Sequence, residues 1–245
     1  SVILMSKLTL HCGAELVELE SLKYIQLPEE TRTYKPVPHY DLVMNTMNSG
    51  DIFLKPQGYE LESTNFGLGR KGKHMFFTLN YGREGAQNGL TIGGRNSYDK
   101  STSIGLAAGM HVFVCDNLMF SGDQVTYLRK HTGNVMDDME IMLMRIMKSA
   151  DNEWKRMTEV SSTLKTELLS DTEAYRWMGL LYGKGVLTPR QLPIVKDNWK
   201  KPNHEEFASK NMWSFYNACT EALKTSPPNQ ILNRHIKLHQ QLVLA

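Results

Sequence analysis

The sequence predicts an α+β fold, in which an antiparallel sheet from the first half of the chain packs against long amphipathic helices from the second half. Between residues 58 and 117, short apolar and aromatic segments alternate with glycines, which is typical of strands joined by tight turns. Between residues 135 and 164, apolar side chains recur every three to four positions, as on one face of a helix. A run of strands followed by a run of helices in a 245-residue chain favours α+β architecture with a shared core.

A helix is expected ahead of the sheet. Residues 8–28 combine short alternating runs with a helical patch, and we expect them to be loosely structured. The segment "TYKPVPHYDLVMNTMNSG" (33–50) has two prolines ahead of apolar residues at helical spacing. Gly50 is expected to end that helix.

Four segments predict the four or five strands of the sheet. They are residues 58–69, 73–82, 89–97 and 103–117. The first two flank "GLGRKGKH" (67–74), which predicts a hairpin whose tip displays Arg70, Lys71 and Lys73. Glycines inside the last two segments predict a bulge or a close approach of another group to the backbone.

The second half predicts helices with recognisable starts and ends. Asn134 is the expected N-cap of a helical pattern that continues to residue 164, either as one long helix or as two with a break near Asp151. Ser170 is expected to cap a helix that ends at Gly183.

Two further helices are expected near the end of the chain. Residues 204–224 predict an amphipathic helix, and "SPPNQ" (226–230) separates it from a last short helix. We therefore expect one domain over residues 1–224, which is sheet-rich over 1–130 and helical over 131–224. A short C-terminal extension over residues 225–245 follows it.

Composition excludes several classes of protein. No apolar run approaches the ~18 residues that a membrane helix needs, so we expect no membrane partner. The three cysteines lie far apart and are odd in number, which predicts neither a disulfide framework nor a paired-cysteine metal site. They fit a reducing, intracellular compartment.

No catalytic or cofactor motif is present in the glycine-rich segments. "GGRNSYDKS" (93–101) lacks the spacing of a P-loop or of a dinucleotide-binding loop. Cys115 and His111 are four residues apart in a predicted strand, so they lie about 13 Å apart and cannot exchange a proton directly. A buried cysteine is the favoured interpretation.

Metal ligation is also weakly supported. His235 and His239 stand four apart on the last helix and could face one ligand, but packed or solvated side chains are favoured. Asp99, Asp116 and Asp123 could hold magnesium, although scattered acidic residues are a weak indication. We expect no catalytic residue, no metal and no cofactor.

The distribution of charge favours a polyanionic partner. Residues 66–100 contain six basic and two acidic residues, and residues 176–201 contain six and one. In the first segment, basic and aromatic side chains interleave, as in surfaces that bind single-stranded nucleic acid. The predicted binding residues are Arg70, Lys71, Lys73, His74, Arg83, Arg95, Tyr98 and Lys100. The alternative is that Phe76 and Phe77 fill the core and the lysines are merely solvated.

Four segments carry a family resemblance. They are "TYKPVPHYDLV" (33–43), "RNSYDKSTSIGLAAGMHVFVCDNLMFSGD" (95–123), "RKHTGNV" (129–135) and "WSFYNACTEALK" (213–224). In order and wording they resemble the phage/plasmid-like family called domain of unknown function 932, from about Leu10 to Lys224. The resemblance implies a protein of a phage or mobile element, and hence the cytoplasm of a bacterial host cell.

The resemblance also suggests roles for the R-N-S-x-D-K-S segment. We expect Asn96 and Asp99 to fix a turn through side-chain-to-backbone hydrogen bonds. Arg95 and Lys100 would then remain free to meet phosphate. The order of elements in the family is similar to that of single-strand annealing proteins, which supports a hypothesis by analogy alone.

We therefore expect a non-enzymatic DNA-binding protein, in its most specific form a single-strand annealing and recombination protein. Its partners would be single-stranded DNA and further copies of itself, with the methionine-rich helix over 135–164 either in the core or at subunit contacts. A protein–protein interaction factor that modulates a host defence complex is the alternative. An enzyme acting on nucleic acid would need a carboxylate or metal cluster that the sequence does not offer.

Overall fold

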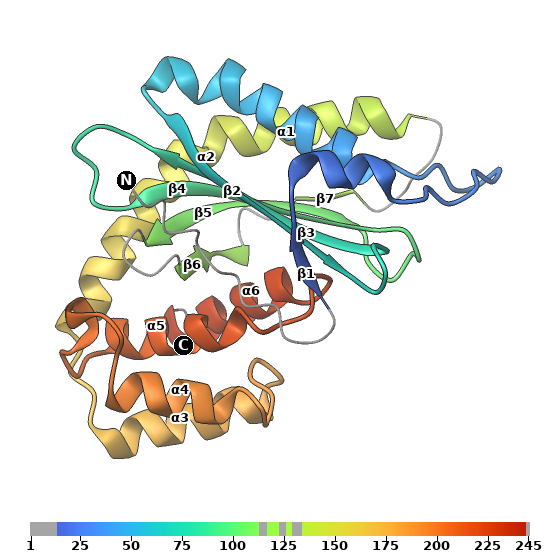
Figure 1. Cartoon of the computed structure of the whole chain (residues 1–245). Helices are drawn as coiled ribbons and strands as arrows, with labels where there is room; N and C mark the ends of the chain where they lie inside the picture. The colour runs from blue at the N-terminus through green and yellow to red at the C-terminus, as the bar shows by residue number, and fades with distance from the viewer. Residues whose placement is uncertain (1–13, 113–116, 123–125, 129–133, 244–245) are drawn as a thin grey trace.

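The computed structural model describes residues 14–112, 117–122, 126–128 and 134–243, which form a seven-stranded sheet between layers of helices (Figure 1). In chain order and side by side lie β1 (Glu15–Val17), β2 (Glu60–Gly69), β3 (His74–Gly82), β4 (Gly89–Ser97), β5 (Ile104–Val112) and β6 (Asn117–Phe120). The last strand, β7 (Thr126–Leu128), pairs with the opposite end of β5 from β6. All neighbours are antiparallel. The predicted fold class is confirmed, with more strands than the four or five expected.

Helices cover both faces of this sheet (Figure 1). One face carries α1 (His39–Phe53) and α2 (Val135–Thr166), and the other carries α5 (Met212–Leu223) and α6 (Ile231–Val243). An outer layer beyond α5 consists of α3 (Asp171–Gly183) and α4 (Leu192–Lys200). Short 3₁₀ segments occur at Leu19–Tyr24, Lys55–Gln57 and Glu205–Phe207. No helix in the described ranges is long and apolar enough to cross a membrane.

The two-residue period of the strands divides the core into two sides. Phe77 packs with α1 and α2, whereas its neighbour Phe76 packs with Ile231 and Ile236 of α6. Every residue of β3, β4 and β5 is buried as a result. Side chains of these three strands therefore do not form an open surface.

Glycines in β4 allow this double-sided packing. A Cβ added at Gly93 would lie 2.6 Å from the ring of Phe120, and one added at Gly94 would lie 2.4 Å from the ring of Phe77. The two glycines face opposite sides, so an aromatic ring can rest against the backbone of β4 on each side. The predicted close approach to the backbone is confirmed at these positions.

Helix α1 corrects one expected boundary. The helix does begin after Pro38, but it continues through Gly50 to Phe53. A Cβ at Gly50 would lie 2.2 Å from the hydroxyl oxygen of Tyr81, so the glycine is needed for the close packing of α1 on β3. The prediction that Gly50 ends the helix was wrong because a long-range contact, and not a helix end, requires the glycine.

Helices α2 and α3 start as predicted, whereas the helix expected over residues 204–224 begins only at Met212, as α5. Helix α2 is one continuous helix through Asp151, and Asn134 occupies its N-cap position without a side-chain capping hydrogen bond. Ser170 caps α3 through a capping box with Glu173, in which the Ser170 Oγ accepts from the Glu173 backbone N–H. Helix α3 ends at Gly183, which confirms the expected end.

Most methionines of α2 lie in the core. Met139, Met142, Met147 and Met157 are buried, whereas Met136 and Met144 are partly exposed. The C-terminal segment from residue 225 contains α6, whose Ile231, Leu232 and Ile236 pack against Phe76 and Phe120 of the sheet. This helix closes the second side of the core.

Candidate functional site

The turn between β2 and β3 displays cations on an unusual backbone. Arg70 (φ 51°), Lys71 (φ 56°) and Gly72 (φ 82°) are consecutive residues with left-handed conformations. The Lys73 N–H donates to the Arg70 carbonyl at 3.2 Å, which closes a tight turn of the kind that favours glycine or asparagine. A left-handed conformation costs a residue with a Cβ about 1–2 kcal/mol. Two basic side chains are therefore held where backbone conformation alone would select other residues.

The turn between β4 and β5 lies directly beside it. The Tyr98 N–H donates to the Lys73 carbonyl at 2.7 Å and joins the two turns. Within this second turn, Asp99 Oδ1 accepts from the Ser101 N–H at 3.0 Å, which confirms the turn-fixing role expected of Asp99. Lys100 also has a left-handed backbone, with φ 61°.

Four cations of these two turns are exposed, and we call them the cationic rim: Arg70, Lys71, Lys73 and Lys100. The Arg70 side chain is 68% exposed and lies 3.2 Å from a carboxylate oxygen of Asp99. Lys100 Nζ lies 4.6 Å from the centre of the Tyr34 ring. Within the described residues, none of the three rim lysines forms an ion pair.

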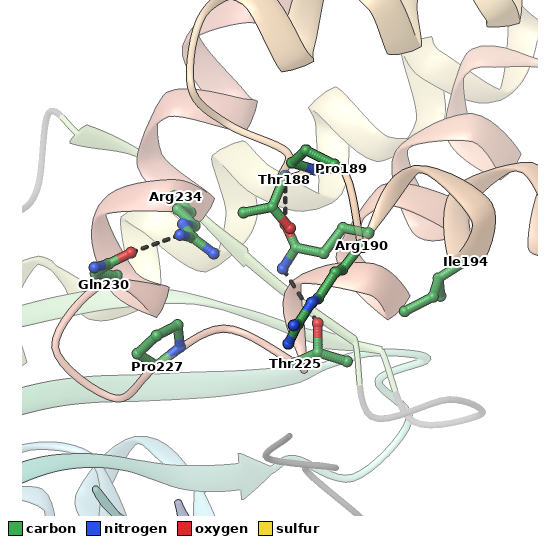
Figure 2. A pocket seen from close by; sticks show the side chains of 9 residues that line it. Thr188, Pro189, Arg190, Ile194, Thr225, Pro227, Gln230 and Arg234 are labelled. Carbon is green, nitrogen blue, oxygen red and sulfur yellow. Dashed lines mark hydrogen bonds between the residues drawn. The ribbon is translucent and has the colours of Figure 1, made fainter. Parts of the chain in front are cut away.

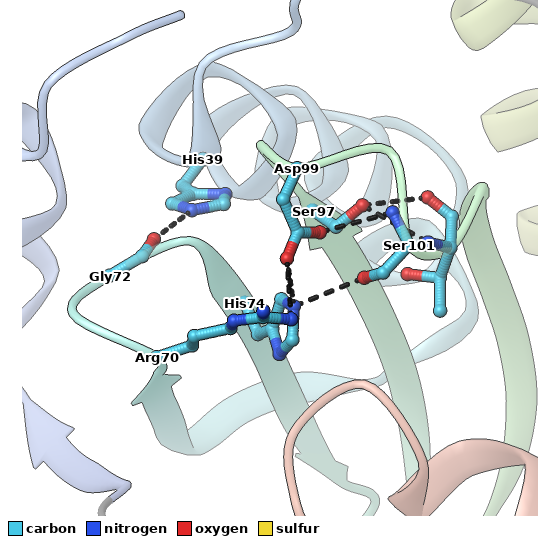
Figure 3. Close-up of polar contacts among 8 residues, drawn as sticks. His39, Arg70, Gly72, His74, Ser97, Asp99 and Ser101 are labelled. Carbon is cyan, nitrogen blue, oxygen red and sulfur yellow. Dashed lines mark hydrogen bonds and ion pairs between the residues drawn. The ribbon is translucent and has the colours of Figure 1, made fainter.

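His39, at the start of α1, contacts the first turn (Figure 3). Its Nε2 lies 2.8 Å from the Gly72 carbonyl, and its Nδ1 lies 3.1 Å from the amide nitrogen of Asn96. A neutral ring with the proton on Nε2 satisfies both contacts, since Nε2 then donates to Gly72 and Nδ1 accepts from Asn96. Burial lowers the pKa of His39 to about 4, against a smaller opposing effect of the Gly72 hydrogen bond.

The second turn is attached to the same helix start. The His39 ring stacks on the Tyr98 ring at 3.8 Å between centroids, and the Tyr98 hydroxyl accepts from the His39 backbone N–H at 2.8 Å. Asn96 donates to the Val37 carbonyl at 2.8 Å. Asn96 therefore anchors the strand to the segment before α1, and the expectation that it fixes its own turn was wrong. Sequence reasoning missed His39, although "PVPHYD" places it at a helix start.

Asp99 lies at the centre of the polar contacts between the turns (Figure 3). Its Oδ2 lies 2.8 Å from His74 Nε2 and 3.2 Å from Arg70 Nη1. Burial alone would raise the pKa of Asp99, but hydrogen bonds from Ser101 and His74 outweigh it and lower the pKa to about 2. Asp99 is therefore an anion at neutral pH and offsets part of the positive charge of Arg70.

Ser101, His74 and Asp99 resemble the residue set of a hydrolase, but their geometry differs from a proton relay. Ser101 Oγ lies 3.0 Å from His74 Nε2, the same nitrogen that contacts Asp99. In a relay, the carboxylate holds one ring nitrogen and the hydroxyl contacts the other. The three groups are thus a structural cluster in this conformation.

Three of the predicted binding residues are buried. His74, Arg95 and Tyr98 are 6%, 5% and 7% exposed. Arg95 Nε donates to the Ser103 carbonyl at 3.3 Å, its guanidinium lies 5.2 Å from the centre of the Tyr127 ring, and burial lowers its pKa. The expectation that Arg95 remains free to meet phosphate was wrong, because helices cover both faces of the sheet to which it belongs.

Arg83 lies away from the rim, at the other end of β3. Its Nη1 is 3.3 Å from Asp151 Oδ1, and its guanidinium lies 5.0 Å from the centre of the Tyr59 ring and 5.3 Å from that of Trp154. The Tyr59 hydroxyl donates to the same Asp151 oxygen at 2.6 Å. Arg83 thus attaches the end of β3 to α2, so the structure does not bring it together with the other predicted cations.

The predicted aromatic platform does not form. Phe76 and Phe77 are 1% and 0% exposed, so these two rings fill the core, as the alternative expected; Tyr81, at 2%, is buried as well. The rim is therefore electrostatic in character, without a stacking surface of aromatic rings beside it.

The two histidines of α6 lie in the core. His235 and His239 are buried, at 2% and 0% exposure, and burial lowers the pKa of His235 to about 3. In the part of the chain that the structure describes, no group of three or more histidine, cysteine or acidic side chains could hold a metal ion. Cys115, Asp116 and Asp123 lie outside the described residues.

One comparison with known proteins gives a match. The family described as "Domain of unknown function (DUF932)" matches residues 30–242. The matched range contains both turns of the rim, the His39 support and the C-terminal helix α6. No curated protein and no solved structure matches the chain.

Proposed function

The chain belongs to the DUF932 family, and on this premise we propose that it is a nucleic-acid-binding protein of a phage or mobile element. In the proposal, the cationic rim holds a single DNA strand by its phosphates. Base edges stay free, so the bound strand can pair with a complement, and no chemical step is needed. Single-strand annealing is the function that this geometry supports best.

One observation carries the proposal. Lys71, Lys73 and Lys100 project from two hydrogen-bonded turns into solvent and form no ion pair with any described residue. Clustered, unneutralised lysines create a positive potential that attracts a polyanion and releases its counterions on binding. The left-handed backbone of Lys71 and Lys100 adds support, because strained conformations gather at ligand-binding positions.

The small number of cations sets the expected strength of binding. Each phosphate contact on a single strand adds about −0.7 to the slope of log K against log salt, so three lysines give about −2. Such binding by one copy is weak and sensitive to salt. Several copies on one strand would bind far more tightly through effective concentration, which is why the proposal includes a homo-oligomer.

Charge reversal at the rim tests the proposal. The wild-type chain is titrated against a fluorescently labelled ~40-base oligonucleotide at low salt, where electrostatic contacts are strongest. The variant Lys71→Glu/Lys73→Glu should lose binding. The matched control is Lys196→Glu/Lys200→Glu, on the exposed side of α4. It changes the net charge by the same amount and should retain most of the oligonucleotide binding.

Two results would contradict the proposal. One is a wild-type chain that does not bind the oligonucleotide at low salt, which would favour a protein partner with an acidic surface instead. The other is an equal loss of oligonucleotide binding in both double variants, which would mean that binding depends on the net charge of the protein and not on the rim. Light scattering with and without oligonucleotide gives the particle size and tests the homo-oligomer.

A further inference from the structure

A cavity of about 690 Å³ lies away from the rim, between the segment that leads into α4 and the segment that joins α5 to α6 (Figure 2). Its volume is within the usual range of small-molecule sites, about 300–1,000 Å³. The lining residues are Thr188, Pro189, Arg190, Gln191, Ile194, Thr225, Pro227, Gln230 and Arg234. The basic composition of residues 176–201 is evident from the sequence, whereas this cavity is evident only from the fold.

The charged residues of the lining are both arginines. Arg190 precedes α4 and Arg234 belongs to α6, so the two guanidinium groups come from different elements (Figure 2). Arg234 is oriented by hydrogen bonds to Ser226 Oγ at 3.0 Å and to Gln230 Oε1 at 2.5 Å. Arg190 is exposed and makes no hydrogen bond or ion pair with the described residues. Among the described lining residues there are thus two positive charges and no carboxylate.

The walls of the cavity are held in place by Gln191. This side chain is 2% exposed, accepts from the Thr188 N–H at 3.0 Å and donates to Ser226 Oγ at 3.0 Å and to the Ala222 carbonyl at 3.2 Å. One buried amide therefore connects the start of α4 to the end of α5. When a ligand binds a cavity whose wall is already fixed, no conformational entropy is lost in ordering that wall.

Two helix starts border the same cavity. The N–H groups of Gln191 and Leu192 bond back to the Thr188 carbonyl at 3.0 and 3.2 Å, and those of Gln230 and Ile231 bond back to the Pro227 carbonyl at 2.9 and 3.0 Å. Gln191 and Ile194 at the start of α4, and Gln230 and Arg234 at the start of α6, also line the cavity, and each helix start carries a partial positive charge. Pro189, Pro227 and Ile194 supply apolar surface beside the charges.

We infer that this cavity binds a small organic phosphate, a phosphate monoester carried on a ring-shaped body of about the size of a nucleoside. The two guanidinium groups would hold the phosphate, since arginine matches phosphate oxygens with paired donors. The prolines and Ile194 would contact the ring. The monoester can come from a free nucleotide or from the phosphorylated end of a strand, and the inference does not depend on the function proposed for the rim.

Calorimetric titration of the full chain with adenosine monophosphate tests the inference. Binding is expected, inorganic phosphate should bind more weakly, and adenosine without its phosphate should bind least. The substitution Arg190→Gln should weaken binding of the monophosphate about tenfold or more, the usual effect of losing one charge-assisted contact. Ile194→Trp should block the cavity, whereas the control Lys196→Gln, on the same helix but outside the lining, should change nothing.

The outcomes separate the sources and can overturn the inference. A 5′-phosphorylated oligonucleotide that competes with the monophosphate, where its 5′-hydroxyl counterpart does not, assigns the cavity to strand ends. Competition by neither assigns it to the free nucleotide. The inference fails if the monophosphate does not bind, if adenosine binds equally well, or if Arg190→Gln and Ile194→Trp both bind like wild type.

Discussion

Replacing Asp99 with asparagine should weaken folding and strengthen strand binding at the same time. Asp99 is the carboxylate that offsets charge in the rim, through Oδ2 at 3.2 Å from Arg70 Nη1 and 2.8 Å from His74 Nε2. Asparagine has nearly the same shape and can still accept from the Ser101 N–H. The substitution thus removes the charge and keeps the turn.

The loss of stability follows from the pKa. Folding lowers the pKa of Asp99 from 3.8 to about 2, and a shift of that size corresponds to about 2.5 kcal/mol of favourable interaction of the charged form. The side chain is 18% exposed, so solvent screens part of this energy. We expect a decrease of about 1–2 kcal/mol in the free energy of unfolding at pH 7.

The gain in binding follows from the freed cation. Without Asp99, Arg70 can contact a phosphate, and the slope of log K against log salt should steepen by about 0.7. At 0.1 M salt one such contact strengthens binding about fivefold. Fluorescence anisotropy over a salt series measures the slope, and urea denaturation measures stability.

The substitution must lower the free energy of unfolding and, at the same time, raise the affinity for the strand. If Asp99 instead belonged to a catalytic or metal-binding group, its loss would weaken the functional interaction. A folded Asp99→Asn variant that binds the strand less tightly than wild type, or with an unchanged salt slope, refutes the assignment of the rim.

Two further predictions concern stability. The pKa of His39 is about 4 and that of His235 about 3, both below the ordinary value of 6.5, so the unfolded chain binds more protons at acidic pH. Stability should fall as pH decreases from 6.5 toward 4, by up to about 3 kcal/mol for His39 alone, and urea titrations of a His39→Asn variant should show a shallower pH dependence. Gly94→Ala places a Cβ 2.4 Å from the ring of Phe77 and should cost about 1–3 kcal/mol by thermal denaturation. The matched control Gly179→Ala meets no atom within 4 Å in α3 and should stabilise the chain by about 0.5–1 kcal/mol, so equal effects of the two changes would contradict the packing account.

Sequence patterns that span only a few residues were sufficient to predict much of the fold. The capping box at Ser170 and the glycine-containing hairpin at residues 67–74 depend on neighbours within a few residues, and both were predictable. Gly50 was misjudged because its role depends on Tyr81, which is distant in the sequence. The covering of the second sheet face by α6 depends on contacts of Ile231 with Phe76, which no local pattern encodes.

The candidate site was predictable to the same extent. The exposure of Lys71 and Lys73 follows from their place at a hairpin tip, so their part in the rim could be predicted. The burial of Arg95 could not, because a basic residue in a strand is solvated when one face of the sheet is open and buried when both faces are covered. The cavity beside Arg190 and Arg234 joins segments far apart in the chain, which meet because α4 and α6 both pack against α5.

Hydrogen exchange with and without a saturating single-stranded oligonucleotide tests the central claim most directly, because it locates the bound strand on the chain. Slower exchange is expected in the two turns of the rim, residues 70–73 and 98–103, with no change near Arg83 at the other end of β3. Protection that is absent from both turns, or confined to other segments while the strand is bound, would show that the rim is not where the polyanion binds.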